Sequence, residues 1–100
     1  MKKAMDYVFT SDNQEILIEG LQKETRAQVI GNYVKCRKDK KLTQDNLAQL
    51  SGISRPNITR FESGKYNPSL EMMVRIAAAM DMELQVSLVR KKRGNKHQNG

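Results

Sequence analysis

A chain of 100 residues fits a single small domain, and its 18 Lys and Arg against 11 Asp and Glu give a formal net charge of +7, which attracts polyanions such as nucleic acid. Its one cysteine excludes an intramolecular disulfide, no Cys/His cluster has metal-ligand spacing, and no apolar run suits a membrane span or a signal peptide. We therefore expect a cytoplasmic protein without a metal, a cofactor or a membrane partner.

Two helices are predicted in the first 40 residues. The polar tract 10–13 offers capping side chains ahead of an apolar run, which predicts a short helix near 13–23. Apolar residues three and four apart predict a second helix from Thr25 to about Lys40. Gly20 and Gly31 weaken these helices by roughly 1 kcal/mol each relative to Ala, so a single bent helix is the alternative.

In the middle of the chain, capping and terminating residues predict two short helices joined by a tight turn. Thr43 can cap the first helix, and Gly52 stands where a left-handed terminating residue is needed. Ser54 can cap the second helix, with Pro56 in its first turn, where a missing N–H costs nothing. Gly64 ends that helix. The pattern predicts a helix-turn-helix unit.

After the helix-turn-helix unit, the spacing of the apolar residues changes from a helical pattern to an alternating one. Ser69 caps a fifth apolar-faced helix that reaches Met80, and the segment Met82–Val89 then alternates apolar with polar residues, which predicts a strand. No second strand of comparable quality is visible, so pairing with the same strand of another copy is the simplest way to satisfy its backbone groups. We therefore expect a symmetric homodimer, with an interface that contains Leu84, Val86 and Leu88.

These elements define a mainly α fold of five helices with a C-terminal β-strand. The division along the chain is an N-terminal helical extension (1–24), a helix-turn-helix domain (25–81), a dimerisation strand (82–90) and a disordered basic tail (91–100). The Lys and Arg run at 90–93 can be a DNA-binding arm or a solvated end.

Base-reading candidates lie on the second helix of the unit. Such a unit lays one helix across DNA and places the next in the major groove. With Ile58 and Phe61 toward the core, Arg55, Asn57 and Arg60 remain on polar faces. Arg can donate two bonds to guanine and Asn can pair with adenine, each pair discriminating by roughly 1–3 kcal/mol. A solvent-facing role is the alternative for any one of these side chains.

Phosphate contacts would fix the register of the protein on DNA. Gln44 stands at a helix N-terminus, which favours an anion, and Lys65 and Asn67 follow the second helix in a turn. The full set of phosphate candidates is Thr43, Gln44, Ser54, Thr59, Lys65 and Asn67.

The run from Leu42-Thr43-Gln44 through Gly52-Ile53-Ser54 to Phe61-Glu62-Ser63-Gly64 resembles the phage repressor and Cro (XRE) family, with a match over about 27–80. The resemblance implies a five-helix bundle that binds palindromic double-stranded DNA operators as a dimer. It implies base contacts from Arg55, Asn57 and Arg60, and a structural ion pair between Arg37 and Glu62. Pro56 departs from the polar residue common there, which suggests an apolar contact in place of a hydrogen bond.

The two ends of the chain resemble HigA-type antitoxins, which repress their own operon and bind a small ribonuclease toxin. The resemblance implies that Met5–Lys23 binds the toxin. A stand-alone phage-type repressor, a protein-interaction module that has kept the fold, and a nonspecific basic DNA binder remain as alternatives.

No catalytic residues are expected. The one histidine, His97, lies in the polar tail, and Cys36 lies in a helix beside Lys35 and Arg37. Without a paired base, an enzyme site is disfavoured. Cys36 is either an exposed thiol with a lowered pKa or a cysteine at the edge of the core.

Overall fold

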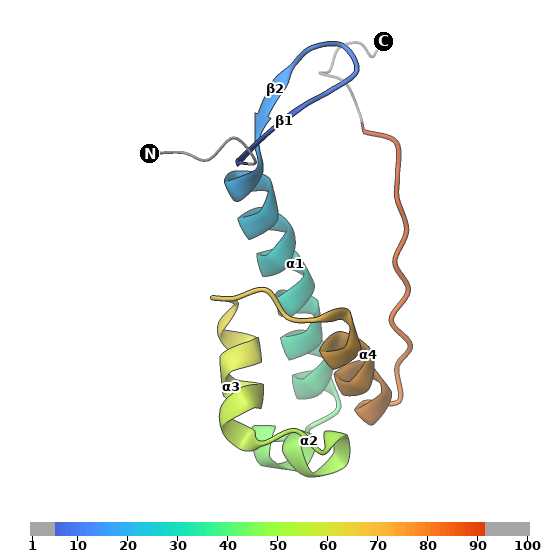
Figure 1. Ribbon diagram of the computed structural model, residues 1–100. Coiled ribbons are helices and arrows are strands. Elements are labelled where there is room, and N and C mark those ends of the chain that lie inside the picture. The colour runs from blue at the N-terminus through green and yellow to red at the C-terminus, as the bar shows by residue number, and fades with distance from the viewer. Residues whose placement is uncertain (1–5, 92–100) are drawn as a thin grey trace.

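The computed structural model describes residues 6–91, which form two strands and four helices (Figure 1). In chain order these are β1 (Tyr7–Phe9), β2 (Glu15–Leu17), α1 (Ile18–Asp39), α2 (Gln44–Ser51), α3 (Arg55–Ser63) and α4 (Leu70–Ala79). Helices α2, α3 and α4 surround the C-terminal half of α1, while its N-terminal half carries the β1–β2 hairpin away from them. None of the described helices is long and apolar enough to cross a membrane.

The core lies where the C-terminal half of α1 meets the other three helices. The ring of Tyr33 meets that of Phe61 edge to face, with centroids 5.2 Å apart, and the Tyr33 hydroxyl donates to the Met73 carbonyl oxygen at 2.8 Å. This arrangement adds directional contacts to apolar burial, and it fixes α1 against α3 and α4. The buried core residues are Ile30, Tyr33, Leu47, Ile58, Phe61, Ile76, Ala77 and Met80.

Capping residues set the limits of α2 and α3. Thr43 and Asn46 form a reciprocal capping box at the start of α2, and the Ser54 hydroxyl accepts from the Asn57 backbone N–H at the start of α3. Gly52 and Gly64 follow these helices with φ of 75° and 69°, a conformation that glycine adopts without strain. The predicted caps and ends of these two helices are confirmed.

The predicted helix at 13–23 is wrong over residues 13–17, because residues 7–17 form a hairpin, and it is confirmed over residues 18–23, which open α1. The tract 10–13 makes the turn: the Thr10 N–H donates to the Gln14 carbonyl oxygen at 2.9 Å, and Asn13 takes φ of 70°. Asn, Asp and Ser favour such turns for the same local hydrogen bonding that makes them helix caps. The strands pair antiparallel, with Val8 opposite Ile16.

One helix, α1, replaces the two predicted between residues 13 and 40. It runs without interruption from Ile18 to Asp39 through both Gly20 and Gly31. Glycine lowers helix stability without terminating a helix, and no proline or cap intervenes. The described residues therefore hold four helices where five were predicted.

The segment 82–90, predicted as a strand, is not one in this structure, and no residue between 6 and 91 pairs with it. The segment after α4 extends away from the bundle (Figure 1), and only Leu84 packs against the core, whereas Val86 and Leu88 are 75% and 100% exposed. Pairing with a second copy stays a prediction. Of the predicted tail 91–100, residues 92–100 lie outside the described part of the chain, and with them His97.

Candidate nucleic-acid interface

Helix α3 has one buried face and one polar face. Ile58 and Phe61 are 0% and 1% exposed and anchor the helix in the core. This anchoring turns the opposite side of α3 to solvent. The exposed residues on α3 and its N-cap are Ser54, Arg55, Pro56, Asn57, Thr59, Arg60 and Ser63.

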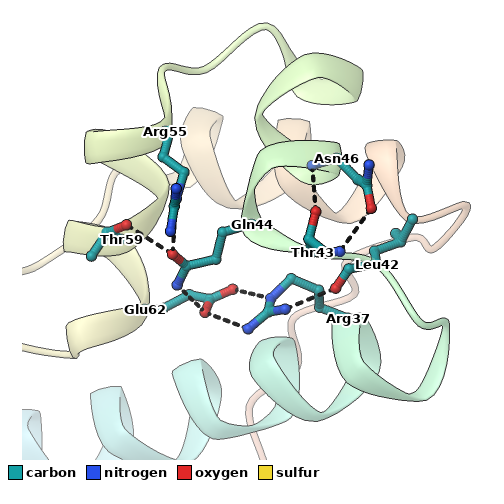
Figure 2. A network of polar contacts seen from close by, with 8 residues as sticks. All are labelled: Arg37, Leu42, Thr43, Gln44, Asn46, Arg55, Thr59 and Glu62. Carbon is teal, nitrogen blue, oxygen red and sulfur yellow. Dashed lines mark hydrogen bonds and ion pairs between the residues drawn. The ribbon is translucent and has the colours of Figure 1, made fainter.

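Arg55, at the N-terminal end of α3, is held by two neighbours from α2. Its Nε donates to Gln44 Oε1 at 3.3 Å, and its Nη1 lies 3.3 Å from Asp45 Oδ1. Figure 2 shows the Gln44 contact. The guanidinium carries five N–H donors, so hydrogens on Nη1 and Nη2 remain for a base edge.

Gln44 links α2 to three positions on α3 (Figure 2). Its amide nitrogen donates to Glu62 Oε1 at 2.9 Å, and its Oε1 also accepts from the Thr59 hydroxyl at 2.9 Å. Both Gln44 and Thr59 were predicted to contact phosphate. In this structure their side chains are engaged within the protein, so a phosphate contact requires them to share or exchange these bonds.

Arg37 and Glu62 form a nearly buried ion pair between α1 and α3. Arg37 Nε donates to Glu62 Oε2 at 2.7 Å and Nη2 to Oε1 at 3.0 Å, while Nη1 donates to the Leu42 carbonyl oxygen at 2.8 Å (Figure 2). The two side chains are 11% and 8% exposed. This is the pair that the family resemblance implies, and it fixes the C-terminal end of α3.

Arg60 points toward the loop that follows α3. Its guanidinium carbon lies 4.5 Å from the centroid of the Tyr66 ring, a cation–π arrangement. Arg60 therefore lies beside the loop, apart from the N-terminal end of α3 where Arg55 and Asn57 were predicted to read bases.

The α3–α4 loop carries two predicted phosphate contacts, Lys65 and Asn67, and both are exposed. Arg26 of α1 holds this loop: its Nε donates to the Gly64 carbonyl oxygen at 2.8 Å, and its Nη1 to Asn67 Oδ1 at 2.6 Å. Sequence reasoning missed Arg26, because its partners lie about 40 positions away and no local spacing connects them. It also missed Asp45, although an acidic residue directly after Gln44 in the sequence could have indicated it.

Cys36 is partly buried and packs against the core. It lines a small cavity of about 180 Å³ with Tyr33, Met80 and Leu84. The cysteine is thus at the edge of the core, the second of the two alternatives. Residues 6–91 contain no group of three or more His, Cys, Asp or Glu side chains that could hold a metal ion.

Comparison with known proteins places this geometry in a family. A curated relative from Bacillus subtilis, the uncharacterized HTH-type transcriptional regulator YqaE, is 43% identical over 53% of this chain and 46% of its own. The immunity repressor protein of Bacillus phage phi105 is 36% identical over 55% of this chain and 39% of its own. The chain thus spans less than half the length of either relative.

A solved structure resembles most of the chain. It is described as a toxin-antitoxin module from Streptococcus pneumoniae, with a TM-score of 0.57 and 27% sequence identity over 82% of this chain and 84% of that chain. The family model of helix-turn-helix domains called HTH_3 matches residues 35–86, which is more than half of the sequence. The chain belongs to this helix-turn-helix family.

Proposed function

We propose that the chain is a sequence-specific DNA-binding transcriptional repressor that inserts α3 into the major groove of a palindromic operator. The observation that carries this proposal is the placement of Arg55 at the exposed N-terminal end of a helix anchored by Ile58 and Phe61. Arg and Asn at this end of the helix suit guanine and adenine edges. Relatives named as transcriptional regulators and as a phage repressor support the same function.

The test is a binding titration against the DNA upstream of the gene and against a scrambled fragment, at two salt concentrations. Wild-type protein should prefer the upstream fragment, and Arg55→Ala should lose roughly 1–3 kcal/mol of that preference. Lys35→Ala is the matched control, since it removes the same charge from a side chain that is 75% exposed on α1, outside the helix-turn-helix unit. Equal, strongly salt-dependent binding to both fragments would mean charge without base readout, and would favour a nonspecific binder or a protein-interaction module.

We further propose that the repressor is an autoregulating antitoxin. The structural neighbour that is a toxin-antitoxin module supports this role. So does the N-terminal extension: residues 6–24 carry five acidic side chains against Lys23 alone, and Val8 and Phe9 are exposed on the hairpin. An acidic surface with apolar side chains fits a basic protein partner such as a small ribonuclease. A stand-alone repressor is the alternative, favoured by the similarity to the phage immunity repressor.

The antitoxin role is tested with the product of an adjacent small reading frame. If this product arrests growth and cleaves RNA, co-expression of the wild-type chain should restore growth. Phe9→Asp should weaken that protection while leaving operator binding intact, because the hairpin is remote from α3 (Figure 1). Absence of protection by the wild-type chain would leave the stand-alone repressor.

A further inference from the structure

The proposed DNA-reading surface contains one exposed carboxylate. Between residues 43 and 67 the acidic residues are Asp45 and Glu62. The Glu62 side chain is 8% exposed and is neutralised by Arg37, whereas the Asp45 side chain is 73% exposed. A carboxylate beside phosphates is repelled by them, so its position in this surface lowers the affinity for DNA in general.

Asp45 also restrains the residue predicted to read bases. It lies in the first turn of α2, where the helix N-terminus favours a negative charge. Its Oδ1 accepts from Arg55 Nη1 at 3.3 Å, while Gln44 Oε1 accepts from Arg55 Nε at 3.3 Å. Two contacts to different nitrogens of one planar guanidinium restrict its orientation, and among residues 6–91 they leave the Nη2 hydrogens for the groove.

We propose that Asp45 is a specificity-determining residue, which orients Arg55 for base readout and opposes binding to DNA that does not engage Arg55. The proposal rests on the proposed repressor function. Both effects, the orientation of Arg55 and the repulsion of other DNA, raise the preference for the operator over other DNA. Without Asp45, Arg55 keeps only its contact with Gln44, so its guanidinium can turn toward any phosphate, and the surface loses its repulsion of the DNA backbone.

The experiment measures dissociation constants of wild-type protein and Asp45→Asn for the upstream fragment and the scrambled fragment. The ratio of the two constants should fall roughly fivefold in Asp45→Asn, mainly through tighter binding to scrambled DNA. Asp45→Glu keeps the charge and should retain most of the ratio. Asp81→Asn is the matched control, because Asp81 follows α4, which lies across the bundle from α3 (Figure 1); it should leave the ratio unchanged.

A double-mutant cycle separates positioning from general charge effects. In an Arg55→Ala background, Asp45→Asn should tighten binding to both fragments equally and change the ratio no further. Circular dichroism of each variant establishes that it is folded. An unchanged ratio for Asp45→Asn in a protein that discriminates, or an equal fall for Asp81→Asn, overturns this proposal alone. If wild-type protein does not discriminate, the proposed function falls and this proposal with it.

Discussion

Glu62 joins α3 to two other helices through one carboxylate, which binds Arg37 of α1 twice and Gln44 of α2 once. Removing its charge leaves the Arg37 guanidinium almost buried and unpaired. Glu62→Gln should therefore lower the free energy of unfolding by about 3 kcal/mol, measured by urea denaturation. Glu71→Gln is the control, because it breaks an exposed pair with Arg75 and should cost less than about 1 kcal/mol. Equal losses in both variants would contradict a special role for the buried pair.

Tyr33 gives the fold a pH dependence in alkaline solution. Desolvation by burial raises the pKa of its hydroxyl above 10.0, so the folded state favours the neutral form. This contribution to stability is complete below pH 10 and is lost as the pH rises through the raised pKa. Tyr33→Phe should therefore lose less stability above pH 10 than wild type, although it should be about 1 kcal/mol less stable at pH 7 because the bond to the Met73 carbonyl oxygen is gone.

The measurement is thermal unfolding of both proteins from pH 7 to pH 11. Tyr7 and Tyr66 are present in both, so the difference between the two curves belongs to Tyr33. Parallel curves over the whole range would show that this hydroxyl does not titrate with folding.

Single-residue roles were predictable where they follow from periodicity along α3. The burial of Ile58 and Phe61 fixes which side of the helix is exposed, and the exposure of Arg55 and Asn57 follows from it. The internal bonds of Gln44 were not predictable. They depend on the angle and distance between two helices, which tertiary packing sets and local sequence does not contain.

At the scale of elements, the α3–α4 loop depends on α1 through Arg26. Arg26→Ala should free the loop that presents Lys65 and Asn67, and weaken binding to the upstream and scrambled fragments alike, by roughly threefold to tenfold. Lys35→Ala is the control. It removes the same charge from α1, but Lys35 pairs with Asp39 of the same helix and not with the α3–α4 loop. Equal weakening in the two variants would mean that net charge, and not the loop, is responsible.

The elements were predictable where capping and terminating residues are specific. Thr43, Gly52, Ser54 and Gly64 have side chains or backbone freedom that suit few other places in a fold. The tract at 10–13 has no such specificity, because the same residue types cap helices and form turns. Its role as a hairpin turn depends on pairing between residues on both of its sides, which short strands signal weakly.

On the scale of the whole molecule, charge and shape are divided along the chain. The N-terminal extension at 6–24 is acidic, while residues 25–91 carry 12 Lys and Arg against 6 Asp and Glu. The extension projects from the bundle on the long helix α1 (Figure 1). The division suits separate surfaces for a basic protein and for DNA, since each surface then repels the partner of the other.

Dimerisation is the prediction that decides how the whole molecule meets an operator. If Met82–Val89 pairs with its copy across a two-fold axis, Val86→Pro removes a backbone donor and should give the 11.4 kDa monomer in light scattering. Val86→Thr is the control, because it keeps the backbone N–H and the branched shape and should remain dimeric. Two recognition helices in such a dimer should protect half-sites separated by roughly 10–10.5 base pairs, or a multiple of this, in DNA footprinting. If Val86→Pro remained fully dimeric, the two-fold contact would lie on another surface. The half-site spacing would then give the distance between the two copies of α3, and this distance would identify that surface.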